Sequence, residues 1–227
     1  DRSMKGKILL LFVILIIPML PACGQKALKE VRSLLKEKKA KEAAVLIDKL
    51  CSDTNYNKMP KLYDLGIQAQ IQLNNVENEK IYLQKPYDTL NFFRTTYNII
   101  DFILKCDNAE RTLLAEKGKK MKFHKNNRTL LHHYFTNLNA AGRYYYKHQQ
   151  FDDVILVMDK LLEIPKMAIW GDDKSFIASK TYTDNVFIFQ HSSFIKNKFE
   201  NVCKYKDITL SDTTHRRYYI EMLSLTA

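Results

Sequence analysis

The chain has 227 residues, of which 46% are hydrophobic and 27% charged, and its formal net charge is +11. This composition excludes an intrinsically disordered chain and supplies enough apolar residues for a sizeable core. Only 6 glycines and 5 prolines are available to punctuate the chain, which argues against a fold of many short strands and favours an all-helical one.

Residues 4–22 have the layout of a secretory leader, and residues 1–3 are interpreted as an upstream remnant. Lys5 and Lys7 precede an apolar run at 8–17, which is short for a helix that crosses a bilayer. A cleaved leader is therefore expected, and an uncleaved membrane anchor is the alternative. The chain stays basic without this segment, and for an exported protein the basic balance favours an anionic membrane surface over nucleic acid. A basic face that is merely solvated is the commonest alternative.

The end of this segment, Leu20-Pro21-Ala22-Cys23-Gly24, resembles the bacterial lipoprotein signal. The resemblance implies that Cys23 carries the lipid and becomes the new amino terminus, and that residues 4–22 are removed. It also implies a location in the bacterial cell envelope. In some surface-exported lipoproteins an acidic run follows the lipid site. Gly24-Gln25-Lys26 is not acidic, which favours the periplasmic side of the outer membrane.

The first expected helical hairpin covers residues 26–51. Apolar residues recur at three- and four-residue spacing on both sides of a lysine-rich turn at 36–39, which predicts two amphipathic helices. The stripe before the turn is Leu28, Val31, Leu34 and Leu35, and the stripe after it is Ala43, Ala44, Ile47 and Leu50.

The second expected hairpin covers residues 62–84. A helix at 62–73 carries the small residue Gly66, Asn74-Asn75 is expected to end it, and a short partner helix is expected at 77–83. After Asp88 a long apolar helix is expected to end near Cys106.

A charged helix is then expected at 108–122. This segment ends in the basic run GKKMKFHKNNR at 118–128, which is interpreted as a solvated loop, with contact to phosphate or lipid head groups as the alternative.

The clearest pattern covers residues 130–165, where two amphipathic helices flank a polar turn at 148–150 and Pro165 ends the second. The first helix carries Leu138, Ala141, Gly142, Tyr145 and Tyr146 on one face. The second carries Val154, Ile155, Met158, Leu161 and Leu162. A small residue such as Gly142 lets the two helices of a hairpin approach closely.

Similar octets recur along the chain. AVLIDKLC at 44–51 matches ILVMDKLL at 155–162, at an offset of 111 residues, and FENVCKYKDITL at 199–210 aligns with 151–162. Together with the small residues and the closing proline, the pattern resembles the tetratricopeptide repeat. The resemblance implies an all-α, right-handed α-α superhelix (a solenoid). It would form one domain over 23–227, with the clearest repeats at about 26–51, 62–84, 130–165 and 185–211.

Tetratricopeptide-repeat proteins generally bind peptides or protein partners in a groove lined by the first helix of each repeat. The resemblance therefore implies a non-catalytic adaptor, and basic side chains in the groove would suit an acidic partner. The side chains expected to face the groove are Asn139, Arg143, Tyr146 and Lys147 in one repeat and Tyr63, Ile67 and Gln70 in another.

Two other functions stay open. The first alternative is the extracytoplasmic sensory part of a longer membrane-bound regulator, and the second is an envelope hydrolase on a helical scaffold. His124 and His132-His133 have no further ligands at metal-binding spacing, and no glycine-rich phosphate loop is present. No catalytic residue, metal, cofactor, small-molecule substrate or nucleic-acid partner is therefore expected. Cys51, Cys106 and Cys203 are expected to be buried free thiols, and the alternative is that one pair of them closes in an oxidising envelope.

Overall fold

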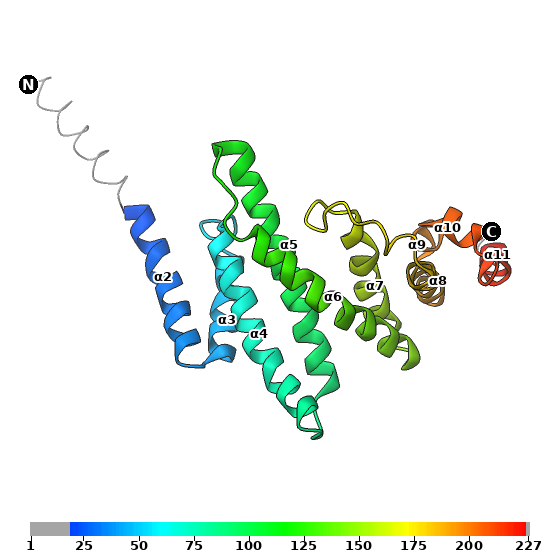
Figure 1. Cartoon of the computed structure of the whole chain (residues 1–227), viewed down its shortest axis with the longest axis horizontal. Helices are drawn as coiled ribbons and strands as arrows, with labels where there is room; N and C mark the ends of the chain where they lie inside the picture. The colour runs from blue at the N-terminus through cyan, green and yellow to red at the C-terminus, as the bar shows by residue number, and fades with distance from the viewer. Residues whose placement is uncertain (1–18, 226–227) are drawn as a thin grey trace, which may run out of the picture. The chain divides into compact units, whose positions relative to one another are not determined.

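The computed structural model describes residues 19–225, and these residues form helices and connecting segments without a strand (Figure 1). The elements are α2 (Met19–Lys36), α3 (Ala40–Cys51), α4 (Pro60–Tyr82), α5 (Thr89–Lys117), α6 (His124–Lys147), α7 (Phe151–Glu163), the 3₁₀ turn η1 (Ile164–Lys166), α8 (Lys180–Ile195), α9 (Phe199–Cys203), α10 (Lys206–Ser211) and α11 (Arg216–Ser224). The all-helical fold class is thus confirmed.

Most of the expected leader, residues 4–18, and the whole of the upstream remnant at 1–3 lie outside the described residues. The backbone of Cys23 lies within α2. No helix between residues 19 and 225 is both long and apolar enough to cross a bilayer.

The chain divides into two compact units that share α5. Unit 1 takes the residues up to Asp88 together with 105–123, and unit 2 takes 89–104 together with the chain from His124 onward. The residues of α5 on either side of position 104 therefore belong to different units. The expectation of one repeat domain over 23–227 stays a prediction.

In unit 1 the hairpin expected at 26–51 is present, because α2 ends at Lys36 and α3 begins at Ala40. Lys38 adopts a positive φ of 61° in the turn. The expected stripes are largely confirmed, since Leu28, Val31 and Leu35 in α2 and Ala43, Ile47 and Leu50 in α3 are buried. Both helices also contact α4.

The expected break at Asn74-Asn75 is wrong, because α4 runs without interruption from Pro60 to Tyr82. Asn74 is fully buried, and its side-chain oxygen accepts a hydrogen bond from Asn78 one turn later, at 2.9 Å. Asparagine weakens a helix when its side chain competes for backbone groups. Here that side chain bonds along the helix, so residues 62–84 do not form a hairpin.

The expected boundary near Cys106 is wrong as well, since α5 continues to Lys117. The helix ends where Gly118 takes a positive φ of 63°, a conformation that glycine adopts without steric cost. The apolar and charged segments that the sequence suggested as two helices are therefore one.

In unit 2 the hairpin of α6 and α7 follows the prediction closely. The turn lies at 148–150, Gln149 takes a positive φ of 58°, and α7 ends at Glu163, before Pro165. A Cβ atom added to Gly142 would lie 2.5 Å from Cε of Met158 on α7. The close approach expected at this glycine is confirmed.

Although residues 199–210 align with the helical segment 151–162, they do not form one helix, because α9 and α10 are two short helices separated by Lys204 and Tyr205. This tyrosine has a left-handed φ of 65°, which ends the helical hydrogen-bonding pattern. The buried Gln190 of α8 fixes the junction. Its amide donates to the Lys204 carbonyl at 2.7 Å and accepts from the Thr209 hydroxyl at 2.6 Å.

Candidate functional site

An apolar groove of about 550 Å³ lies in unit 2 between α8 and α11. Its lining consists of aromatic and aliphatic side chains with a few polar ones, namely Phe187, His191, Phe194, Ile195, Thr214, His215, Tyr218, Glu221, Met222 and Leu225. Pockets of this size and character are typical of binding sites for small apolar ligands or for the anchor residues of a peptide.

Both walls of the groove arise from the same helical spacing. On α8 the lining residues Phe187, His191 and Phe194 follow at intervals of four and three residues, which places them on one face. Tyr218 and Met222 of α11, together with Leu225 directly after it, repeat that spacing. Two matched faces thus form opposite sides of the groove.

Hydrogen bonds and buried side chains outside the groove hold α8 and α11 in position. Ser179 caps α8 by accepting a hydrogen bond from the Tyr182 amide at 3.2 Å. Tyr182 and Phe189 are buried within unit 2, and the Tyr182 hydroxyl donates to the Leu162 carbonyl of α7 at 3.3 Å. On α11 the buried Tyr219 donates to the Val202 carbonyl of α9 at 2.8 Å.

The groove leaves large apolar side chains open to solvent. Ile195 is 40% exposed, Tyr218 60% and Leu225 75%. Exposed apolar residues are ordinary when they are scattered, but a group that lines one depression marks an interaction surface.

Two histidines contribute polar atoms to the groove. His215 stacks on Phe187 with ring centroids 4.2 Å apart and an interplanar angle of 5°, and its Nε2 lies 2.9 Å from an Asp184 carboxylate oxygen. Burial opposes the ionisation of Asp184, but hydrogen bonds from Lys180 and His215 outweigh it, so the pKa of Asp184 is lowered. His215 is therefore held against the aromatic wall.

His191 connects the groove to α6. Its Nδ1 lies 3.0 Å from the hydroxyl of Tyr146, one of the residues expected to face a partner. Burial lowers the pKa of His191, because the charged imidazolium loses its hydration. The ring is therefore held neutral over a wider pH range than a solvated histidine.

Two further α6 residues of the expected groove, Asn139 and Arg143, also contact α8. Arg143 donates to the side-chain oxygen of Asn185 at 3.1 Å, and the Asn185 amide donates to Asn139 at 2.8 Å. Asn139, Arg143 and Tyr146 therefore hold α8 on α6, although Arg143 keeps an exposed side chain. Lys147 is exposed at the end of α6.

The α4 residues expected in the groove are placed differently. Tyr63, Ile67 and Gln70 are all buried in unit 1, and the Tyr63 hydroxyl donates to the backbone of Asn57. Their assignment to an open partner-binding surface is wrong in this structure. The physical reason is the continuity of α4, which is enclosed over most of its first half rather than lying at the edge of a short hairpin.

A second cleft of about 700 Å³ in unit 2 is lined by α5, α7 and the segment around α9. Its lysines are already neutralised by carboxylates. Lys204 lies 2.6 Å from Asp159, and Lys160 pairs with Asp101. A charged ligand would have to break these pairs, so the α8–α11 groove is the better candidate site.

The histidines of α8 and α11 were not among the site residues expected from sequence. The spacing of Phe187, His191 and Phe194 was visible, but three aromatic-type residues on one helix face indicate core more often than a site. Within residues 19–225, no group of three or more histidine, cysteine and acidic side chains is arranged to hold a metal ion.

The chain was compared with protein families, curated proteins and solved structures. No family model matches the chain, and neither a curated protein nor a solved structure does.

Proposed function

We propose that this protein is a non-catalytic, lipid-anchored adaptor of a bacterial cell envelope, and that the α8–α11 groove binds an apolar segment of another protein. The observation that carries the proposal is the group of exposed apolar side chains, Ile195, Tyr218 and Leu225, along one groove. Groups of exposed apolar side chains are usually buried against a binding partner in the functional complex.

The fitting occupant is one amphipathic helix of a partner protein. The two walls repeat the four-then-three spacing of a helix face, and an incoming helix with apolar anchors at that spacing would fit between them. Arg143 and Lys147 on α6 are exposed and basic, so acidic residues beside those anchors would add complementary charge.

The tetratricopeptide-like arrangement is part of the same proposal. The hairpins α2–α3 and α6–α7 support it, as does the close helix approach at Gly142. In repeat proteins each helix pair covers an apolar face of its neighbour. A right-handed superhelix of such hairpins is the arrangement that we propose.

The anchoring part of the proposal has a direct test at Cys23. Cells that express the full chain would be labelled with an alkyne-bearing fatty acid. The wild-type protein should incorporate the label and fractionate with the outer membrane, and Cys23→Ala should do neither. Equal labelling of the two proteins would remove lipidation at Cys23 from the proposal.

The binding part is tested by a photo-crosslinking amino acid placed at Tyr218, with Tyr82 of α4 as the control site because its side chain is 86% exposed. One discrete crosslinked partner is expected from position 218 and none of that mass from position 82. The adduct should vanish in Tyr218→Lys/Leu225→Lys and persist in Val45→Lys/Val76→Lys, which changes exposed apolar residues of unit 1.

The Lys147→Ala variant separates the two parts of the surface, because Lys147 is exposed at the end of α6, whereas Arg143 also bonds α8. Weaker crosslinking there, with the groove intact, would assign the acidic flank of the partner to α6. Persistence of the adduct in Tyr218→Lys/Leu225→Lys would show that the groove is not the binding site.

A further inference from the structure

The helix α2 has one basic face. Lys26, Lys29, Arg32 and Lys36 follow at intervals of three, three and four residues, and all four are exposed. This spacing gathers them on one side of the helix, away from the buried Leu28, Val31 and Leu35.

These four cations are not neutralised within the protein. Among residues 19–225, no carboxylate lies within ion-pair distance of Lys26, Lys29, Arg32 or Lys36, whereas Lys204 of unit 2 has two acidic partners. Cations without a close carboxylate partner attract an external anionic surface, and the exposed Glu30 and Glu37 nearby offset only part of the four charges.

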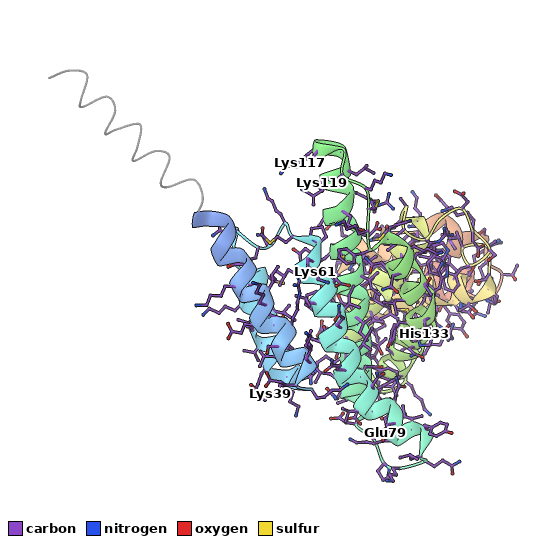
Figure 2. All side chains as sticks on the ribbon, turned by 60° about the vertical axis from the view of Figure 1, so that its left-hand side comes forward. Lys39, Lys61, Glu79, Lys117, Lys119 and His133 are labelled. Carbon is purple, nitrogen blue, oxygen red and sulfur yellow. The ribbon has the colours of Figure 1, made fainter. Side chains whose placement is uncertain are left out.

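The charge continues past the end of the helix. Residues 26–41 hold seven basic and two acidic side chains, and Figure 2 shows Lys39 at the turn that follows α2. Lys39 itself pairs with Glu37 at 2.8 Å, but Lys38 and Lys41 beside it are exposed. The basic character therefore extends over the α2 side of the hairpin.

The composition of this face distinguishes between anionic partners. No aromatic residue occurs between residues 26 and 55, so the stacking platforms that accompany nucleic-acid binding are missing from it. The exposed side of α2 also carries no large apolar residue between Lys26 and Lys36, which suits contact with head groups rather than insertion among acyl chains.

We propose that α2 lies against an anionic bilayer surface, with Lys26, Lys29, Arg32 and Lys36 contacting lipid phosphates. The inference rests on the membrane location proposed above. The backbone of Cys23 lies in the same continuous helix, one turn before Lys26, so a lipid there would hold the basic face at the surface. A basic patch next to an acyl chain is a recognised second signal for stable anchoring.

The test is lysine footprinting of the full chain in vesicles. Vesicles of phosphatidylcholine alone are compared with vesicles that also contain phosphatidylglycerol, and acetylation of each lysine is followed by mass spectrometry. Lys26, Lys29 and Lys36 should react several-fold more slowly in the anionic vesicles. The exposed Lys85 of unit 1 and Lys206 of unit 2 should react equally in both.

Salt and substitution sharpen the result. At about 1 M salt, where the screening length falls to roughly 3 Å, the protection should disappear. In Lys26→Gln/Lys29→Gln, Lys36 should lose most of its protection, because each basic side chain near an anionic surface contributes roughly a fivefold effect on binding. The matched Lys85→Gln/Lys206→Gln variant should keep it.

The outcomes separate this inference from the anchoring proposal. Flotation with both vesicle types and equal acetylation in both would overturn the basic-face contact while leaving an anchor. Flotation with anionic vesicles alone, with protection of α2, would support the contact and count against the anchor. Failure to float with either would overturn both.

Discussion

At the scale of single residues, Gly142 shows how one missing side chain sets a helix pair. A Cβ at this position would lie 2.5 Å from Cε and 3.2 Å from Sδ of Met158, and 3.3 Å from Val157. The nearest atom is the end of a flexible side chain, and alanine also favours a helix over glycine by about 1 kcal/mol. A single methyl group is therefore tolerated, and a larger side chain is not.

Gly142→Leu should lower the free energy of unfolding by about 1–3 kcal/mol, because it overpacks the contact of α6 with α7. Urea unfolding followed by circular dichroism measures the change. Gly142→Leu/Met158→Ala should recover part of it. Ala140→Leu, on the exposed side of α6, should stay within about 0.5 kcal/mol of the wild type. An equal loss from both leucine variants would contradict the packing argument.

Two buried tyrosines make the protein sensitive to alkaline pH. Burial, with smaller contributions from nearby acidic groups and, for Tyr219, from Cys203, raises the pKa of Tyr182 and of Tyr219 to about 12, from an ordinary value of 10. The unfolded chain ionises first as the pH rises. The stabilising contribution of each is therefore complete below about pH 10 and is lost as the pH approaches 12.

Ionisation of each tyrosine should lower the free energy of unfolding by roughly 2–3 kcal/mol between about pH 10 and pH 12. Unfolding free energies measured from pH 9 to pH 12 should fall steeply, and the fall should be shallower in Tyr182→Phe and in Tyr219→Phe. Tyr218→Phe is the control, because that ring is exposed. A pH profile that none of the three variants changes would show that other groups cause the loss.

At the scale of elements, α8 organises unit 2 through polar bonds that are buried beside its apolar contacts. The clearest is Gln190, which holds the Lys204 carbonyl and the Thr209 hydroxyl on either side of Tyr205. Leaving such buried groups without partners costs more than the bonds themselves contribute. The break between α9 and α10 is therefore fixed by α8.

Gln190→Leu should destabilise the protein by about 2–4 kcal/mol, since it orphans an acceptor and a donor. Thr209→Val orphans one acceptor and should cost less. Because both variants disrupt the same bond, Gln190→Leu/Thr209→Val should cost less than the sum of the two single changes in urea unfolding. Strict additivity would indicate that the two side chains do not interact.

Hydrogen exchange can test whether α4 is continuous through Asn74 and Asn75. Backbone amides around Asn74 should be protected from hydrogen exchange, as those around Ile67 should be, because both residues are buried and lie in one uninterrupted helix. The connecting segment at 83–88 should exchange fast. Rapid exchange at Asn74 and Asn75 would restore the hairpin that the sequence suggested.

At the scale of the whole molecule, the helices with strong amphipathic periodicity could be predicted from sequence. The side-chain hydrogen bonds that extend or interrupt a helix could not. The turns at 36–39 and 148–150 and the contact at Gly142 follow from local spacing and residue size. The helix break predicted at Asn74 was wrong because residue propensities do not include the side-chain hydrogen bond that Asn74 accepts from Asn78. The break at Tyr205 was not predicted because Gln190, 15 residues away in sequence, stabilises it. Tyr146 was expected to face a partner, and its hydroxyl lies 3.0 Å from Nδ1 of the groove residue His191, but the groove itself was not predicted, because α11 had no recognisable partner in the sequence.

The shared helix α5 has a consequence for the order of folding during synthesis. Unit 1 is completed by residues 105–123, which leave the ribosome only after residues 89–104 of unit 2 have been made. The amino-terminal helices therefore cannot complete their packing, and part of their surface stays uncovered, while the first residues of unit 2 are being synthesised. Domains that fold cotranslationally usually finish one at a time. Here the first unit closes late, and a nascent chain stalled before residue 105 should be the form most dependent on chaperones.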